Sequence, residues 1–239
     1  MLFHPLPFFD DRTTPIDMLI FHCSALNTAE MLETLHNHQL SCHYIIDTDG
    51  TITSCVEEQK RAWHSGLGSW REIKTDTNSH SIGIELTSLS LGQLPYSELQ
   101  IESLINLSRK IINRHHIKPQ NIVGHSDTAP TRKPDPGIAF PWQRLACNGI
   151  GLWYDISQAD FAPTDDLKKL LSGIGYNTDT EESFHAAQYA FARHFFPKLV
   201  QTNLNIGELV DNVYPLDTDF STNDELINVA KAVYMRFNP

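Results

Sequence analysis

Two histidines and an aspartate in this sequence have the residue types and positions of a catalytic zinc site. His22 lies in the apolar stretch MLIFHCSA (18–25), His125 ends the stretch NIVGH (121–125), and Asp135 lies ten residues further on. Two imidazoles and one carboxylate would leave a fourth Zn²⁺ position open for water, as a catalytic site requires. The spacing alone is not specific, and its alternative interpretation is a core histidine and an aspartate in a turn.

His125 and Asp135 both belong to a polar loop, GHSDTAPTRKPDPG (124–137). Its three prolines restrict φ, so we expect the path between these two residues to be fixed. Lys133 lies two residues before Asp135, and a cation there can stabilise the oxyanion that forms when water attacks an amide. Taken alone, Lys133 is also typical of a solvated loop lysine.

Glu85 is a candidate for proton transfer. It lies in SIGIEL (81–86), an apolar stretch in which a carboxylate is costly unless it is paired or close to a metal. It is therefore a candidate general base, or a partner of a metal ligand, with a buried salt bridge as the alternative. A cysteine mechanism is disfavoured, because Cys23 follows His22 on a predicted strand and consecutive side chains point to opposite faces.

The elements that must position these residues alternate between strand and helix. Apolar and turn patterns predict strands over 18–25, 81–86 and 121–125 and a hairpin over 42–56 with Gly50 in its turn. Helices are predicted over 28–38, capped by Thr28, and over 97–116, where Ser97 and Gln100 have the spacing of a capping box. Residues 57–80 are polar and show no clear hydrophobic period, so they are interpreted as a long surface loop.

This alternation predicts an α/β fold in which helices cover a sheet. If the strands that carry His22 and lead to His125 are parallel neighbours, both imidazoles lie at one edge of that sheet, where functional groups collect. Beyond Trp153 the strand patterns stop. Three amphipathic helices are predicted there instead, in DDLKKLLSGIGY, EESFHAAQYAFARHFFP and DELINVAKAVYMRF. We therefore predict a catalytic domain over 1–155 and a small all-α module over 164–239.

The composition excludes several classes of protein. A chain of 239 residues with a net charge of −11 lacks the basic face that nucleic acid or an anionic membrane surface requires. No apolar run reaches the length of a membrane span, and the N-terminus lacks the pattern of a signal peptide. The four cysteines have no CxxC spacing and are expected to be reduced packing residues, namely Cys23, Cys42, Cys55 and Cys147.

Five stretches, spread over about residues 18–145, resemble one known family both in their residues and in their order along the chain. They are FHCSA, SCHYIIDTDGTI, RAWHSGLGSW, SIGIEL and GHSDTAPTRKPDPGIAFPW. The family is the zinc-dependent N-acetylmuramoyl-L-alanine amidases of the amidase-2 group, of the AmpD/AmiD type. These are related to T7-type lysozyme and peptidoglycan recognition proteins. The resemblance implies a central mixed β-sheet flanked by helices.

The resemblance also implies roles for individual residues. It makes His22, His125 and Asp135 the ligands of one catalytic Zn²⁺, and Glu85 and Lys133 the catalytic pair. It places four further residues at the substrate, namely Trp63, His64, His43 and Arg132. The tyrosine that T7-type relatives carry before the histidine of their H-[YF]-x-I segment is replaced here by Cys42, so tyrosine-assisted catalysis does not carry over.

The implied reaction is hydrolysis of the amide between the lactyl group of N-acetylmuramic acid and L-alanine, in peptidoglycan or in muropeptides. The C-terminal stretch resembles a helical peptidoglycan-binding module, with a packing appendage as its alternative. The main rival function is a protein that binds muropeptide without cutting it. The module favours the periplasm, provided that a signal segment has been removed, whereas the N-terminus as given favours the cytoplasm. We expect a monomer.

Overall fold

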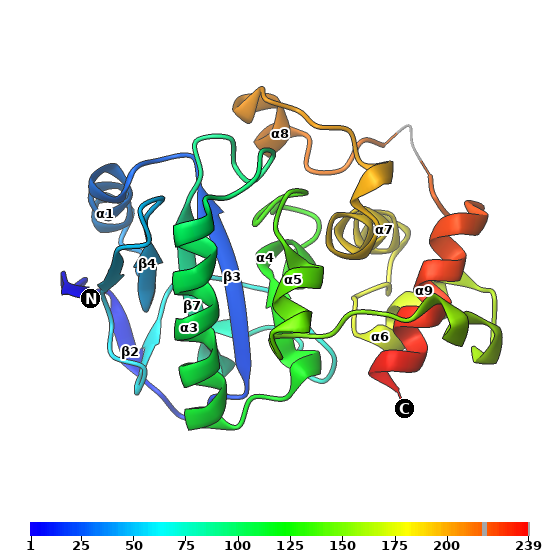
Figure 1. Cartoon of the computed structure of the whole chain (residues 1–239), viewed down its shortest axis with the longest axis horizontal. Helices are drawn as coiled ribbons and strands as arrows, with labels where there is room; N and C mark the ends of the chain where they lie inside the picture. Colours follow the sequence, from blue (N-terminus) through cyan, green and yellow to red (C-terminus); the bar gives the residue numbers. More distant parts are fainter. Residues whose placement is uncertain (217–218, 239) are drawn as a thin grey trace.

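Six strands form a mixed sheet in the part of the molecule that holds the candidate site (Figure 1), in the order β1-β5-β4-β7-β3-β8. The computed structural model describes residues 1–216 and 219–238. Only the β4–β5 hairpin of this sheet is antiparallel. The strands are β1 (Leu2–Phe3), β3 (Met18–Ser24), β4 (Tyr44–Ile46), β5 (Ile52–Ser54), β7 (Ser81–Thr87) and β8 (Ile122–Gly124). A second, two-stranded sheet pairs β2 (Phe9–Asp11) with β6 (Lys60–Ala62).

In Figure 1, the helix α3 lies over one face of the central sheet, and α4 and α5 lie beside β3. The α-helices are α1 (Thr28–Asn37), α2 (Thr77–His80), α3 (Glu98–His115), α4 (His125–Thr128), α5 (Trp142–Cys147), α6 (Leu167–Ile174), α7 (Glu181–Phe195), α8 (Ile206–Asp211) and α9 (Asp224–Phe237). Three 3₁₀ turns span Pro119–Asn121, Ile156–Phe161 and Pro197–Leu199. The predicted α/β class, with a mixed sheet and a helical C-terminal part, is confirmed.

The strand β3 is buried on both faces, which explains the apolar run of its first four residues, 18–21. Successive side chains on a strand point to opposite faces. Leu19 and Phe21 therefore pack on the side of α3, in one apolar cluster with residues such as Leu104. Met18 and Ile20 point the other way, and His22 continues that second face towards the carboxyl end of the strand.

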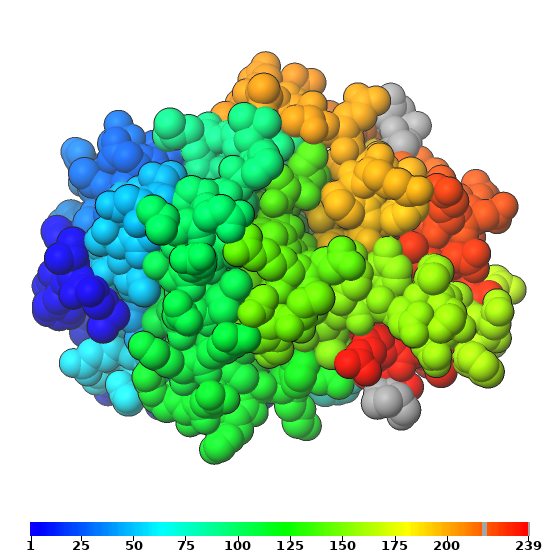
Figure 2. Space-filling model, viewed as in Figure 1, coloured from blue at the N-terminus to red at the C-terminus, as the bar shows by residue number. Residues whose placement is uncertain are grey.

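The three helices α6, α7 and α9, here called the C-terminal helices, share an apolar core with this second face. One cluster of buried side chains contains Met18, Ile20 and Val123 of the sheet together with Phe191 of α7 and Val233 of α9. Figure 2 shows the surfaces of the two parts meeting without a gap on the face that it presents. The predicted break at 155–164 contains the 3₁₀ turn Ile156–Phe161 and does not separate two independent cores.

Two predicted helix caps are wrong in detail. The cap of α1 is Asn27 rather than Thr28, and it forms a capping box with Glu30. Ser97 does cap α3, but the side chain of Gln100 donates to the carbonyls of β4 and β7, at 2.9 and 3.0 Å, instead of returning to the helix end. Because buried strand carbonyls lie within its reach, the Gln100 amide binds the helix to the sheet.

The region 57–80 is only partly the surface loop that its sequence suggests. It contains β6, whose partner β2 lies near the N-terminus, and the short helix α2. Trp70 within it is 1% exposed and donates from Nε1 to the carbonyl of Gln120 at 2.9 Å. Contacts with distant parts of the chain give this segment its structure. The absence of a hydrophobic period in its own sequence therefore does not make it a loop.

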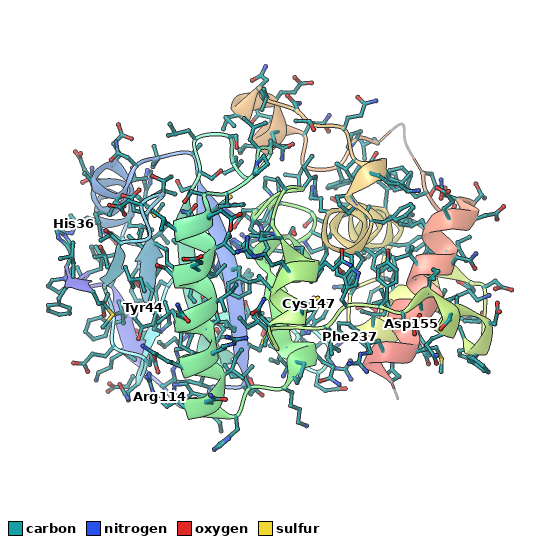
Figure 3. The ribbon with its side chains drawn as sticks, in the orientation of Figure 1. His36, Tyr44, Arg114, Cys147, Asp155 and Phe237 are labelled. Carbon is teal, nitrogen blue, oxygen red and sulfur yellow. The ribbon has the colours of Figure 1, made fainter. Side chains whose placement is uncertain are left out.

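The prediction of reduced packing cysteines holds for three of the four residues. All four cysteines are free thiols, and three of them are buried, whereas Cys147 on α5 (Figure 3) is exposed. In residues 1–216 and 219–238, none of the helices has both the length and the apolar character needed to cross a bilayer.

Candidate metal centre

The fold brings the three predicted metal ligands together. The strand β3, which carries His22, pairs in parallel with β8, and His125 follows β8 directly as the first residue of α4. The expectation of two parallel neighbouring strands is therefore confirmed, although His125 begins a helix rather than ending a strand. Asp135 reaches the same place from the loop after α4, and all three side chains are buried, between 1% and 6% exposed.

One nitrogen or oxygen from each residue points to a common centre. His22 Nδ1 and His125 Nδ1 are 3.0 Å apart, and Asp135 Oδ2 lies 3.3 Å from the first and 3.2 Å from the second. Ligands at the corners of a tetrahedral Zn²⁺ site are separated by about 3.3 Å, given metal–ligand bonds of about 2.0–2.1 Å. The donor set and its spacing thus fit a zinc ion.

The charges of His22 and Asp135 suit a cation as well. Burial and the neighbouring His125 lower the pKa of His22 to about 4, so its imidazole is neutral at pH 7. Burial opposes ionisation of Asp135, but the neighbouring rings, His125 before His22, outweigh it and hold the pKa of that carboxyl well below its usual range. A neutral imidazole and an ionised carboxylate are the protonation states in which histidine and aspartate bind metals.

Hydrogen bonds around His22 fix which of its nitrogens faces the centre. The Ser81 hydroxyl donates to the carbonyl of Thr77 and so accepts from His64 Nε2 at 3.2 Å. His64 Nδ1 is then an acceptor, and it receives Nε2–H of His22 at 2.9 Å. His22 Nδ1 is left with a free lone pair directed at the centre, as expected when an outer partner sets the tautomer of a ligand.

His125 is oriented in the same manner by the opposite ring nitrogen. Its Nε2 donates to the carbonyl of Ser65 at 3.0 Å, so its Nδ1 lone pair also faces the centre. Arg132 is an exposed residue, and its guanidinium donates to that carbonyl at 2.6 Å and to the carbonyl of Leu67. Arg132 therefore fastens the 65–67 segment beside the centre.

The loop that presents Asp135 is held by close packing. The Ser126 N–H donates to the Asp135 carbonyl at 2.7 Å, and the Tyr96 hydroxyl donates to the Pro136 carbonyl at 2.7 Å. Gly92 has a φ of +67°, and a Cβ at that position would lie 1.8 Å from the Pro136 carbonyl oxygen. A side chain at Gly92 would therefore displace the residue next to Asp135, which supports the expected fixed path of the loop.

Glu85 lies beside His22, because these two residues pair in register between β7 and β3. Burial and the charge of Asp135 raise the pKa of Glu85 to about 8, and the charge of Lys133 opposes the rise. Its Oε2 has no hydrogen-bond partner among the described residues. Glu85 thus offers a carboxyl oxygen next to the centre that can take up and release a proton near neutral pH.

Comparison with known proteins now assigns the chain to a family. Residues 12–138 match the family model described as N-acetylmuramoyl-L-alanine amidase. The chain belongs to this amidase family. The match covers the region that holds all three candidate ligands, Glu85 and Lys133.

Individual relatives agree with the assignment over most of the chain. The amidase AmiD of Escherichia coli K12 is 38% identical over 211 residues, which are 77% of this chain and 76% of the relative. A solved structure of E. coli AmiD with anhydro-N-acetylmuramic acid-L-Ala-D-γ-Glu-L-Lys has a TM-score of 0.76 and 32% identity, over 95% of this chain and 92% of that one. The structure of AmpDh3 from Pseudomonas aeruginosa matches the full length of both chains, with a TM-score of 0.77 and 27% identity. The predicted enzyme class, an amidase of the AmpD/AmiD type, is confirmed.

Within the amidase site, two of the four predicted substrate residues have other contacts. His43 is fully buried; its Nδ1 accepts from the Gly83 N–H at 3.0 Å, and its Nε2 donates to the Lys60 carbonyl at 3.1 Å. It has no surface for a ligand, so that prediction is wrong. His64 forms hydrogen bonds with His22 and Ser81, as described above, and so acts on a candidate metal ligand.

The other two predicted substrate residues retain surface. Trp63 is partly exposed, and its Nε1 donates to Asp10 at 2.8 Å, beside the ring of Phe8. Arg132 is exposed and holds the 65–67 segment. Their contacts with a substrate stay predictions.

The sequence interpretation missed the residues that orient the ligands, above all Ser81 and the Ser65 carbonyl. One signal was available. Gly83 lies inside the strand β7, and a glycine within a strand marks a place where another group approaches closely. That group is the ring of His64, since a Cβ at Gly83 would lie 2.4 Å from its Cγ.

Proposed function

We propose that this amidase is zinc-dependent and hydrolyses the amide bond between the lactyl group of N-acetylmuramic acid and L-alanine in muropeptides. The observation that carries the proposal is the convergence of His22 Nδ1, His125 Nδ1 and Asp135 Oδ2 at tetrahedral spacing. The family assignment and the muropeptide bound in the related AmiD structure support the choice of substrate.

In this proposal His22, His125 and Asp135 hold the metal. Zn²⁺ held there supplies polarisation of the amide carbonyl and makes water a stronger nucleophile at neutral pH. The protein contributes fixed ligand directions, because each imidazole donates its outer N–H to a protein acceptor. Little reorganisation is then needed when substrate arrives.

Glu85 moves the proton. Water adds to the carbonyl carbon, the C–N bond breaks, and the departing amine of L-alanine must gain a proton. The unpartnered Oε2 of Glu85 can accept the proton of the attacking water and deliver it to that amine. Its raised pKa, about 8, brings uptake and release of that proton into the neutral range.

Lys133 stabilises charge on the substrate. Its side chain is partly exposed, and its charge acts on both Glu85 and His22. A cation in this position lowers the energy of the oxyanion that develops on the carbonyl oxygen. The polar loop 124–137 therefore supplies two metal ligands and the positive charge needed in the same step.

The decisive experiment is mass spectrometry of a defined anhydro-muropeptide after incubation with metal-loaded protein. Release of a free stem peptide that begins with L-alanine is expected. Intact substrate that nevertheless binds the protein would favour the rival function, a muropeptide-binding protein. Rapid cleavage of peptides that lack muramic acid would instead identify a different acyl amide as the substrate.

The form of the substrate is a separate question with its own assay. Intact sacculi and soluble anhydro-muropeptide are compared at equal stem-peptide concentration. Faster release from sacculi would favour the cell envelope, and faster release from the soluble form would favour the cytoplasm.

A further inference from the structure

A buried carboxylate joins the metal-binding loop to the C-terminal helices. Asp127 on α4 is 1% exposed and accepts three hydrogen bonds. Its Oδ2 accepts from the Gly124 N–H at 2.8 Å and from His194 Nδ1 at 2.8 Å, and its Oδ1 accepts from the Tyr176 hydroxyl at 2.6 Å. Neither the proposed reaction nor the metal centre uses this carboxylate directly.

The two side-chain donors come from the C-terminal part of the chain. Tyr176 follows α6, and His194 lies in the last turn of α7. Both are buried, at 3% and 4% exposure. The His194 ring also stacks on Trp142 of α5, with 3.7 Å between centroids and 15° between planes. This stacking leaves the His194 donor little freedom, so the position of the Asp127 carboxylate depends on the C-terminal helices.

The third donor lies at the turn that presents a metal ligand. Gly124 ends β8 and His125 begins α4, so the bond from Gly124 to Asp127 closes the turn between strand and helix. The backbone carbonyl of His125 is held in the same turn, since it accepts from the Thr128 hydroxyl at 3.1 Å. A shift of the Asp127 carboxylate would move the backbone from which the His125 imidazole projects.

We propose that Tyr176 and His194 are positioning residues for the metal centre, acting through Asp127 on His125. The inference rests on the proposed zinc site. Buried carboxylates need their full set of donors, because a lost donor leaves a desolvated oxygen without compensation. The C-terminal helices are then part of the metal-binding apparatus, in addition to any contact that they make with peptidoglycan.

Three full-length variants test the proposal. His194→Phe keeps a flat ring in the stack but removes the donor, and Tyr176→Phe removes one hydroxyl. His194→Asn offers an amide N–H near the position of Nδ1 and should restore the hydrogen bond. Zn²⁺ affinity is measured by competition with a chromophoric chelator, and the ligand geometry by the visible absorption of the Co²⁺-substituted protein.

His194→Phe and Tyr176→Phe are expected to lower Zn²⁺ affinity about tenfold and to alter the Co²⁺ spectrum. His194→Asn should stay within about twofold of the original affinity. Val233→Ala is the matched control: it opens the shared core at a residue that is 0% exposed and makes no hydrogen bond to Asp127, so it should lower thermal stability and leave Zn²⁺ affinity unchanged.

Unchanged affinity and spectrum in Tyr176→Phe and in folded His194→Phe would overturn the inference. Equal losses of affinity in Val233→Ala and in the two phenylalanine variants would also overturn it, because the effect would then be general loosening. These outcomes are distinct from a failure of the proposed function, which would appear as absence of Zn²⁺ binding or of muropeptide cleavage in the unaltered protein.

Discussion

Replacing Gly83 with alanine should weaken the metal centre without touching a metal ligand. A Cβ at this position would lie 2.4 Å from Cγ and 2.5 Å from Nδ1 of His64. Carbon atoms in contact prefer separations of about 3.5–4.0 Å, so the ring must retreat by about 1 Å. His64 is not a free end that can swing away, since it is bound to His22 on one side and to Ser81 on the other.

The retreat has two measurable consequences. The hydrogen bond between His22 Nε2 and His64 Nδ1, now 2.9 Å, would lengthen beyond bonding distance, and His22 would lose the partner that fixes its tautomer. Loss of such an outer partner lowers metal affinity about 10–100-fold. The overpacked core should also lower the free energy of unfolding of the metal-free protein by about 1–3 kcal/mol.

Chelator competition gives the Zn²⁺ affinity, and urea denaturation of the metal-free protein gives the free energy of unfolding. Gly207→Ala on α8 is the matched control, because its Cβ would meet only Asn205 Oδ1, at an ordinary 3.6 Å. That variant should keep its metal affinity and gain up to about 1 kcal/mol of stability. A folded Gly83→Ala protein with unaltered Zn²⁺ affinity would refute the chain of hydrogen bonds through His64.

Three more predictions concern the proposed catalytic pair and the ion cluster around the buried Glu58. Glu85→Gln should retain Zn²⁺ while muropeptide turnover falls about 10²–10⁴-fold, because the amide cannot take up a proton. Lys133→Met should lower kcat about 10²–10³-fold, because it removes the positive charge that stabilises the oxyanion. Elemental analysis should find the metal content unchanged. Glu58→Gln should lower the free energy of unfolding at pH 7 by about 1–3 kcal/mol, a deficit that shrinks on acidification.

The sign of the last prediction follows from the surroundings of Glu58. Burial opposes its ionisation, but hydrogen bonds from Arg114 and His115, at 2.5 Å each, and from Tyr44 at 2.7 Å outweigh it and lower the pKa of Glu58. Arg114 reaches the cluster from the C-terminal end of α3 (Figure 3). A lowered folded-state pKa gives stability that is present above the unfolded pKa and is lost as the pH falls through the folded one.

Each of these predictions has a contrary result. Turnover close to that of the unaltered protein in Glu85→Gln or Lys133→Met would remove that residue from the mechanism. A stability deficit in Glu58→Gln that stays constant between pH 7 and acid, in urea titrations at each pH, would show that the charge of Glu58 contributes nothing.

The sequence was most informative where a motif fixes chemistry and least informative where distant segments meet. His22, His125 and Asp135 were predicted as metal ligands because their motifs resemble a family, whereas their spacing alone left a structural interpretation open. His43 was misassigned because a histidine at the start of a hairpin strand can face either a cleft or the core. The decision depends on Gly83, whose N–H reaches the ring from the strand β7.

The C-terminal helices illustrate the same limit. Their amphipathic patterns correctly predicted that each buries one face, but a pattern does not name the surface against which that face packs. Val233 and Phe191 pack with Met18 and Ile20 of the sheet, and Tyr176 and His194 bind Asp127. These contacts join residues that are far apart in the sequence, so a local sequence pattern cannot predict them.

The core shared by the sheet and the C-terminal helices has a consequence for synthesis of the protein. The ribosome has made all three proposed metal ligands once it reaches residue 135. The partners of Met18, Ile20 and Val123 on α7 and α9 end only at Phe195 and Phe237. A nascent chain therefore carries an incompletely covered apolar face until α9 has been made, and such surfaces are where growing chains aggregate or recruit chaperones.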